Sequence, residues 1–213
     1  MNHSETTIQT YNACADQYKK EISPLKIYNE TYEYFASLLA EKAEVLELGC
    51  GPGNASKFIK NIRSDISITG IDLAPAMIKL AKEELPDDRF FVDDVRNIGT
   101  YKNKYDAILG AFCVPYLNKE ELETMIVNCQ KLLNPDGVLY LSVVGGDHTQ
   151  SGPVTESFTN GMEVYVFFYP YEHIWSLLHE NNFVEKKKFD TPFPLSDGSF
   201  SSDFVLICQK QGS

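Results

Sequence analysis

Three glycines at alternate positions follow an apolar run in the segment VLELGCGPGNA, residues 45–55. Because Gly49, Gly51 and Gly53 carry no Cβ, the backbone there can turn tightly and approach a bulky ligand closely. A GxGxxG fingerprint for a nicotinamide or flavin dinucleotide would need a glycine where this chain has Asn54. The spacing therefore predicts a ligand-binding turn and leaves the ligand open.

Carboxylates follow the next two apolar segments. Asp72 ends the run ITGID, and a carboxylate at the C-terminal edge of a strand can accept hydrogen bonds from both hydroxyls of an adenosine ribose. That feature alone also fits NAD. In the run FFVDDV, Asp93 and Asp94 follow the apolar residues, and an acidic acceptor there can take the exocyclic amine of adenine. A ligand with adenosine but no pyrophosphate fits better than NAD, while solvent-facing caps at the strand ends are the alternative for Asp72 and Asp94.

The elements that would carry these residues alternate between strand and helix from about Glu44 onward, which predicts a mostly parallel sheet covered by helices. The clearest helix follows Asn118, where Glu121 completes a variant of the capping box and apolar residues recur at helical spacing. The segment NPDG, residues 134–137, predicts a turn at its end. Strands are expected at residues 45–48, 67–71, 89–92, 105–111 and 138–144, with further β-like runs at residues 183–189 and 203–208.

Taken in order, these segments resemble the class I (Rossmann-like) S-adenosylmethionine-dependent methyltransferases over nearly the whole chain. The resemblance implies an α/β fold with a doubly wound, seven-stranded, mostly parallel sheet, an antiparallel last strand and an N-terminal helical cap. The matching motifs are ELGCGPG at residues 47–53, GIDLA at residues 70–74 with Met77, FVDDV at residues 91–95, and YDAI at residues 105–108 followed by LLNPDGV at residues 132–138.

The segment before the glycines predicts helices, because Tyr28, Tyr32 and Phe35 recur at helical spacing. Residues 1–43 are therefore expected to form an N-terminal helical cap or lid, and residues 44–213 the Rossmann-like, S-adenosylmethionine-binding methyltransferase domain. After the fifth strand comes the polar segment GGDHTQSGPVTESFTNG, whose length favours a binding loop or lid over a plain connection.

The resemblance implies S-adenosylmethionine as the cofactor and assigns residues to its parts. Gly49 and Gly51 would contact the methionine portion through backbone groups, and Asp72 would hold the ribose. Leu73 would pack on the face of the adenine, unless it is an ordinary core leucine. Asp94 would accept a hydrogen bond from the adenine amine.

Two further assignments complete this implied site. The backbone amide of Val95 would donate to a ring nitrogen of the adenine. The aromatic N-terminal segment resembles the part that covers the cofactor in related enzymes, and Tyr18, with Tyr11 as a second candidate, would close over it. The alternative for Tyr18 is a packed helix face.

Methyl transfer from a sulfonium is an in-line displacement on an activated carbon, so the enzyme can act largely by holding the reacting atoms in line. A base is needed only for an acceptor that is protonated at the working pH. The candidates are His148, in the loop after the fifth strand, and Tyr116, with a solvated loop and a packed turn as their alternatives. The histidines lack metal-ligand spacing, so no metal site is expected. The aromatic run from Tyr165 to Tyr169 could line an acceptor pocket.

The composition narrows the partners of this 213-residue chain. Its net charge of -11 argues against nucleic acid, and the compact basic cluster, Lys186 to Lys188, is read more simply as an exposed strand edge. Five scattered cysteines and the lack of a membrane-spanning apolar run predict a reduced, cytoplasmic protein with no membrane segment. The expected function is methyl transfer to a small-molecule acceptor. The alternatives are an S-adenosylmethionine-binding regulatory protein without catalysis, and a protein or RNA methyltransferase.

Overall fold

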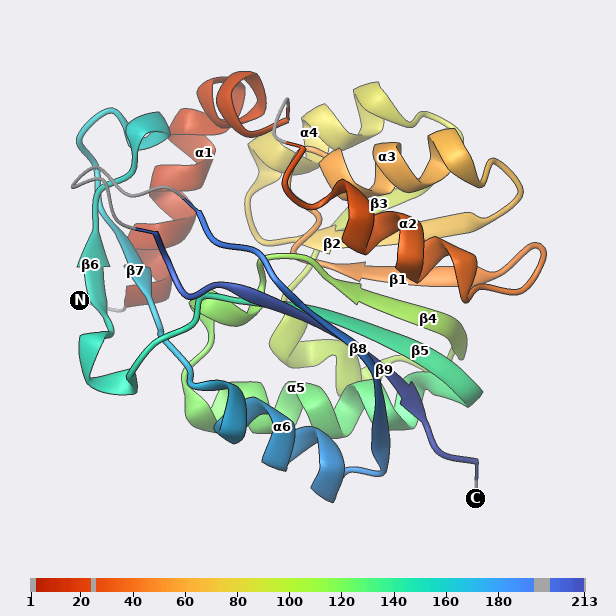
Figure 1. Cartoon of the computed structure of the whole chain (residues 1–213). Coiled ribbons are helices and arrows are strands. Elements are labelled where there is room, and N and C mark those ends of the chain that lie inside the picture. Colours follow the sequence, from red (N-terminus) through yellow and green to blue (C-terminus); the bar gives the residue numbers. More distant parts are fainter. Residues whose placement is uncertain (1–2, 24–25, 194–199, 213) are drawn as a thin grey trace.

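The computed structural model describes residues 3–23, 26–193 and 200–212, and its centre is a seven-stranded sheet with the order β3-β2-β1-β4-β5-β9-β8 (Figure 1). Strands β1 to β5 run parallel to one another, and β9 runs antiparallel to both β5 and β8. This confirms the predicted sheet and its antiparallel last strand. The strands are β1 (Glu44–Leu48), β2 (Ser67–Asp72), β3 (Arg89–Val92), β4 (Tyr105–Gly110), β5 (Leu133–Val143), β8 (Phe183–Asp190) and β9 (Phe204–Lys210).

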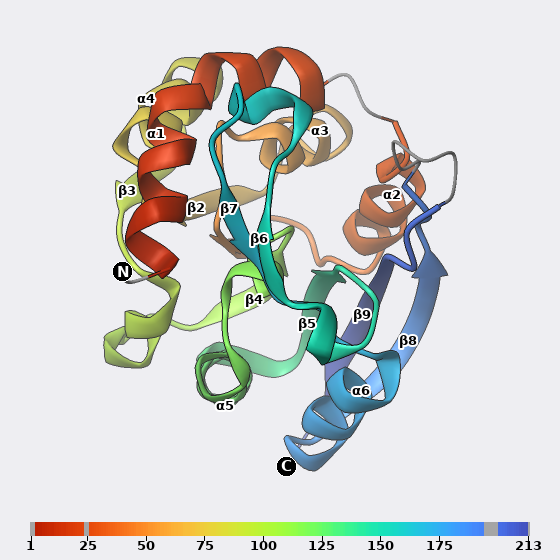
Figure 2. The same cartoon turned by 90° about the vertical axis from the view of Figure 1, so that its left-hand side faces the viewer.

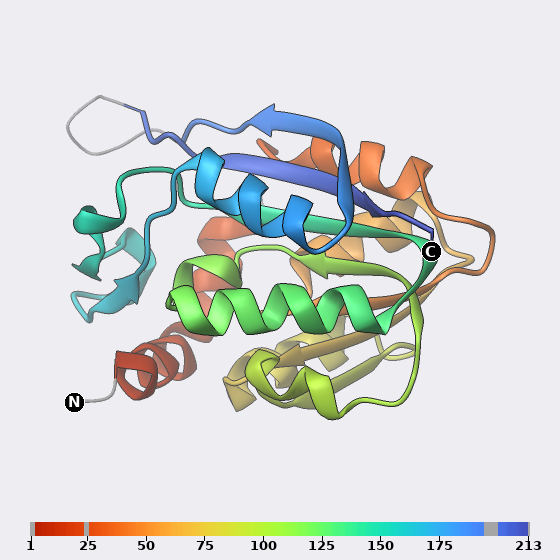
Figure 3. The same cartoon turned by 90° about the horizontal axis from the view of Figure 1, so that it is seen from below.

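Helices cover both faces of the sheet, which makes the fold doubly wound (Figure 3). One face is covered by α2 (Asn29–Ser37), α3 (Asn54–Ile62) and α4 (Pro75–Glu84), and the other by α5 (Lys119–Leu132) and α6 (Tyr171–Glu180). Successive residues of β1 point to opposite faces, so Val45 joins the core cluster beneath α2, α3 and α4, and Leu46 joins the core cluster beneath α5 and α6. Each such side chain stabilises the fold by roughly 1.5–3 kcal/mol when it is fully buried.

Helix α5 begins as its sequence predicts. The Asn118 side chain accepts a hydrogen bond from the Glu121 amide (2.9 Å), and the Glu121 carboxylate accepts one from the Asn118 amide (3.0 Å). These two bonds satisfy amides that have no partner within the helix, so the capping box fixes where α5 starts.

Strand β5 starts earlier than expected, directly after α5 at Leu133. Tyr105 of β4 pairs with Leu133, and Ala107 pairs with Val138, so the NPDG residues between these pairs form a bulge within the strand. Asp136 takes a positive φ of 60° there. The predicted turn chemistry is present, but tertiary pairing continues the strand on both sides of it.

The N-terminal segment divides into two parts. In α2, Tyr32 and Phe35 belong to the core cluster on one face of the sheet, and the Tyr32 ring lies 5.6 Å from that of Tyr140. Helix α1 (His3–Ile22) contributes to neither main cluster among the described residues. It packs instead on α4 through a small cluster of Ala15, Ala74 and Met77. A cap role therefore suits α1 better than α2.

The long polar segment after β5 contains a small antiparallel sheet, which periodicity did not predict. It is formed by β6 (Gly152–Val154) and β7 (Val164–Val166), with the 3-10 helices η3 (His148–Gln150) and η4 (Ser157–Thr159) beside it. Figure 2 shows these strands next to α1. The Thr10 hydroxyl donates to the Glu163 carbonyl (2.8 Å), and the Tyr165 amide donates to the Thr7 hydroxyl (3.1 Å). Helix α1 is thus held between α4 and this hairpin.

Within the described ranges, no helix combines the length and the apolar character needed to cross a membrane.

Candidate functional site

A cavity of about 210 Å³ lies where the glycine turn and the C-terminal ends of β2 and β3 face helix α1. The C-terminal edge of a parallel sheet is the usual ligand site in open α/β folds, because loops from several strands meet there. Each residue that the family resemblance assigned to the cofactor lines this cavity: Tyr18, Gly49, Gly51, Asp72, Leu73, Asp94 and Val95. Their binding of a cofactor is a prediction, and their convergence on one cavity supports it.

Gly49 and Gly51 suit the turn for different structural reasons. Both have positive φ values, 65° at Gly49 and 52° at Gly51, which glycine adopts without strain. A Cβ at Gly49 would lie 3.0 Å from the Cβ of Cys113, whereas a Cβ at Gly51 would meet no atom within 4 Å. Gly49 therefore permits close packing below the turn, and Gly51 leaves room open beside the cavity that it lines.

Asp72 ties the glycine turn to the start of α4. One carboxylate oxygen accepts a hydrogen bond from the Gly51 amide (2.9 Å), and the other accepts one from the Ala74 amide (2.8 Å). Burial raises the pKa of Asp72, and these two amides partly offset the rise. Because each carboxylate oxygen has a second lone pair, Asp72 keeps acceptor capacity for the hydroxyls of a ligand.

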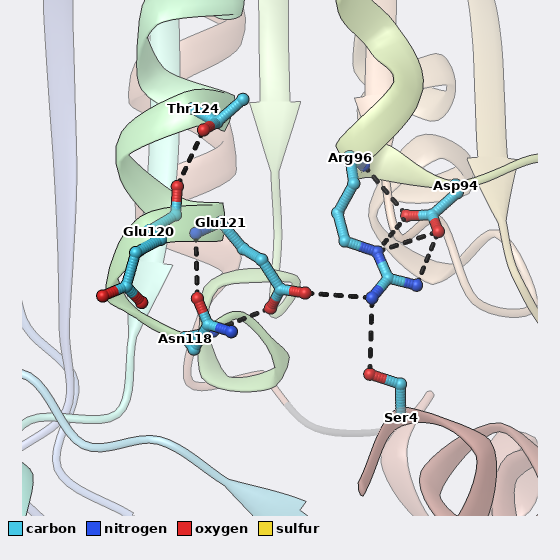
Figure 4. Close-up of polar contacts among 7 residues, drawn as sticks. All are labelled: Ser4, Asp94, Arg96, Asn118, Glu120, Glu121 and Thr124. Carbon is cyan, nitrogen blue, oxygen red and sulfur yellow. Dashed lines mark hydrogen bonds and ion pairs between the residues drawn. The ribbon is translucent and has the colours of Figure 1, made fainter. Parts of the chain in front are cut away.

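Asp94 lines the cavity and also caps a 3-10 helix, so the alternative read from the sequence is present and the adenine contact stays a prediction. Its side chain accepts a hydrogen bond from the Arg96 amide (2.9 Å) at the start of η1 (Val95–Thr100). The Arg96 guanidinium also donates hydrogen bonds to this carboxylate, from Nε (2.9 and 2.8 Å) and from Nη2 (2.6 Å). Figure 4 shows that Nη1 of Arg96 reaches Glu121 (2.9 Å) and the Ser4 hydroxyl of α1 (3.5 Å). Arg96 thus connects Asp94, which lines the cavity, to both α5 and α1.

Glu47 is a buried carboxyl in β1 that also lines the cavity, with a side chain that is 1% exposed. The Ser56 hydroxyl donates a hydrogen bond to it. Burial raises the pKa of Glu47 to about 8, and the negative charge of Asp72 adds to the rise. The side chain is therefore mostly protonated and neutral at pH 7. The motif ELGCGPG contains Glu47, but sequence reasoning assigned no role to this residue.

One face of α1 forms the wall of the cavity opposite the glycine turn. Sequence reasoning found Tyr18 and Tyr11 there but missed the rest of the stripe, although its residues recur at helical spacing and could have been read from periodicity. The residues of α1 that line the cavity are His3, Ser4, Thr7, Ile8, Tyr11, Tyr18 and Ile22.

Tyr11 is the centre of an aromatic cluster in this wall. Its ring lies 5.7 Å from Tyr18, 5.5 Å from Tyr116 and 5.9 Å from Phe158. The hydroxyls of Tyr11 and Tyr116 share a hydrogen bond. Burial raises the pKa of Tyr116 to about 12 and that of Tyr11 well above its usual value. Both phenols therefore keep their protons at neutral pH, so Tyr116 lines the cavity as a hydrogen-bonding group and not as a ready base.

His148 lies outside the group of described residues that line the cavity. Its ring packs 5.1 Å from Tyr169, and its Nδ1 lies 3.1 Å from the Phe168 carbonyl oxygen. We therefore do not assign His148 a role as a base. Of the aromatic run, Tyr165 lines the cavity, while Tyr169 is fully buried and donates its hydroxyl to the Leu117 carbonyl (2.6 Å).

The lysine cluster lies on β8, which is an edge strand of the sheet. Lys187 is 3.6 Å from Glu30 and 4.2 Å from the centre of the Phe189 ring, and Lys188 pairs with Asp190. These contacts fit the reading of the cluster as an exposed strand edge. The described part of the chain holds no group of three or more His, Cys, Asp or Glu side chains arranged for a metal ion.

Comparison with known proteins shows what the chain is similar to. Residues 45–137 match a family model described as a methyltransferase domain. The trans-aconitate 2-methyltransferase of Escherichia coli is 38% identical over 109 residues, which cover 50% of this chain and 42% of that protein. The demethylmenaquinone methyltransferase of Thermotoga maritima is 30% identical over 98 residues, covering 46% of this chain and 42% of that protein. The chain spans about half the length of the curated relatives it matches.

A solved structure extends the likeness to the whole fold. The magnesium protoporphyrin IX methyltransferase of Synechocystis PCC 6803, solved with S-adenosylmethionine bound, has a TM-score of 0.71 and 14% identity, and the alignment covers 99% of this chain and 98% of that one. At that identity the likeness concerns the fold. Residues 45–137 therefore resemble a methyltransferase domain, and the chain has the fold of an S-adenosylmethionine-dependent methyltransferase, as the sequence predicts.

Proposed function

We propose that this chain binds S-adenosylmethionine in the cavity beneath α1 and transfers its methyl group to a small-molecule acceptor. One observation carries the proposal: residues from separate segments, chosen by motif alone, line a single cavity at the C-terminal edge of the sheet. The open space at Gly51 and the remaining acceptor capacity of Asp72 suit a ligand that bears hydroxyls and lies against the backbone.

When bound, S-adenosylmethionine supplies an electrophilic methyl group on a sulfonium. In our proposal Gly49 and Gly51 hold the methionine portion through backbone groups, and Asp72 holds the ribose. Leu73 packs on the adenine, and Asp94 and the Val95 amide bind its edge. These groups fix the position of the reacting carbon, which is the main contribution that such a displacement requires.

Helix α1 would cover the site and form part of the acceptor pocket. Tyr11, Tyr18 and Tyr116 would exclude water and offer hydroxyls to the acceptor. Because the phenols of Tyr11 and Tyr116 stay protonated, we propose that the protein orients the acceptor and that the acceptor's own nucleophile needs no phenolate base.

Calorimetry with S-adenosylmethionine, S-adenosylhomocysteine and NAD tests the cofactor. We expect binding of the first two and none of NAD, and tight NAD binding without S-adenosylmethionine binding would refute the proposal. Release of S-adenosylhomocysteine against a metabolite panel then tests transfer.

A binding protein without catalysis is the second candidate. The observation that favours it is that burial raises the pKa values of Tyr11, Tyr116 and Glu47, which line the cavity, so these groups keep their protons and are not ready bases. Cofactor binding with no transfer to any class of acceptor would support this candidate. The relatives named for trans-aconitate and demethylmenaquinone differ in acceptor, so they do not decide between acceptors here.

We also propose a reducing compartment, the cytoplasm, because the cysteines are buried, free thiols that form no disulfide among the described residues.

A further inference from the structure

The hydrogen-bonding capacity of the Asp94 carboxylate is filled by one residue, Arg96. Oδ1 of Asp94 accepts from the Arg96 amide (2.9 Å) and from Nε (2.9 Å), and Oδ2 accepts from Nε (2.8 Å) and Nη2 (2.6 Å). Each carboxylate oxygen has two lone pairs, so both oxygens are fully used. Asp72 differs, because each of its oxygens accepts one amide and keeps a lone pair. An adenine amine can therefore bind Asp94 only if a donor of Arg96 leaves.

Arg96 has a second carboxylate to which it can move. Its Nη1 already lies 2.9 Å from Oε1 of Glu121, and Oε2 of Glu121 accepts from the Asn118 amide, so the capping box holds this carboxylate in place. Figure 4 shows Arg96 between Asp94 and Glu121. Asp94 and Arg96 are among the described residues that line the cavity, whereas Glu121 is not. A guanidinium that leaves Asp94 for Glu121 therefore moves away from the cavity and keeps a partner for its charge.

We propose that Arg96 occupies the place of the adenine amine on Asp94 in the free protein, and that the cofactor displaces it toward Glu121. This inference rests on the proposed function, in which Asp94 binds the edge of the adenine. The amine then gains its hydrogen bond only by breaking those of Arg96, so it adds little net affinity. Arg96 is thus a specificity-determining residue: it sets how strongly the site selects adenine over a purine that lacks the amine.

Two ligands that differ only in this amine test the proposal. Calorimetry measures the affinities for S-adenosylhomocysteine and for its 6-deamino analogue, in which hydrogen replaces the purine amine. Their ratio reports what the amine contributes. Arg96→Met removes the competing donors and keeps an unbranched side chain, so this ratio should be at least threefold larger than in wild type. A smaller increase, or a decrease, would show that Arg96 does not compete with the amine.

A conservative variant and a control accompany this measurement. Arg96→Lys keeps a positive charge but loses the planar set of donors, so its ratio should lie between those of wild type and Arg96→Met. If Arg96→Met does not fold, a ratio in Arg96→Lys no larger than in wild type overturns the inference. Arg89→Met makes the same change at an exposed arginine that does not belong to the described lining of the cavity, and should leave the ratio unchanged.

Glu121 tests where the guanidinium goes. Glu121→Gln removes the charge that receives Arg96 while it keeps an acceptor for the Asn118 amide. Displacing Arg96 then costs more, so the affinity for S-adenosylhomocysteine should fall at least threefold. Glu123→Gln makes the same charge change at an exposed position of α5 and should not alter this affinity. Equal affinities in the two glutamine variants would refute the movement toward Glu121.

These outcomes separate the two proposals. If the protein binds neither S-adenosylmethionine nor S-adenosylhomocysteine, the proposed function fails. If it binds both and the ratio does not rise in Arg96→Met, the function stands and the role of Arg96 is refuted.

Discussion

Replacing Glu47 with glutamine should change how the stability of the protein depends on pH. Burial raises the pKa of this carboxyl from its ordinary 4.5 to about 8. The folded protein therefore holds a proton that the unfolded chain releases between these two values. A raised carboxyl pKa contributes stability that is complete below pH 4.5 and is lost as the pH rises through 8.

The magnitude follows from the two pKa values. Each pKa unit corresponds to about 1.4 kcal/mol, so between pH 5 and pH 8 this one group should lower the free energy of unfolding by about 3 kcal/mol. Glutamine has no such titration. The difference in stability between Glu47→Gln and wild type should therefore shift in favour of the variant by about 3 kcal/mol across that range.

Urea unfolding of both proteins at several pH values from 5 to 8, without cofactor, measures this difference. The comparison uses the change with pH, because the glutamine amide carries its own constant cost beside Ser56 if it lacks a partner. Glu123→Gln, an exposed substitution with the same chemistry, should show no such shift. A difference between Glu47→Gln and wild type that stays constant with pH would show that Glu47 is ionised in the folded protein.

Three further predictions concern the candidate site. Asp72→Ala should weaken S-adenosylmethionine binding at least tenfold, about 1.4 kcal/mol, and by more than Asp94→Ala, because Arg96 already occupies much of the Asp94 carboxylate; equal calorimetric affinities for wild type and Asp72→Ala would refute the ribose assignment. Gly51→Val should abolish binding, whereas Gly161→Val, also at positive φ with open space around it, should cost stability alone; unchanged affinity in Gly51→Val would remove the turn from the site. Deletion of residues 1–20 should leave the circular dichroism signal of the sheet and reduce affinity, with turnover reduced more; unfolding of the truncated protein would make α1 part of the core.

The sheet and most of the cavity could be predicted because their signals are local. Glycines after an apolar run and carboxylates at the ends of the next runs need no partner to be recognised. Parallel topology then gathers Gly51, Asp72 and Asp94 at one edge, so ordered motifs were enough to place them together.

The rest depends on contacts between distant segments. Arg96 joins Asp94 to Glu121 on α5 and to Ser4 on α1, and nothing in the local sequence around Arg96 indicates either distant partner. The bulge in β5 has a similar cause, because pairing with β4 resumes at Val138 after a turn sequence that by itself predicts a loop.

Helix α1, which covers the cavity, and Asp72, which lines it, are both attached to the start of α4. The Asn12 side chain of α1 accepts a hydrogen bond from the Ala76 amide (3.0 Å), one of the amides at the start of α4 that has no partner within that helix. Asp72 accepts from Ala74 two residues earlier, so the predicted ribose site and α1 both cap the same helix end. Since α1 adds nothing described to the two main clusters, its position depends on such polar contacts, including those to the hairpin of β6 and β7, and on the small cluster around Met77. A ligand that orders the segment from Asp72 to Ala76 should therefore also order α1. Because α1 is attached by these contacts and not by the main core clusters, it can open locally without unfolding the sheet.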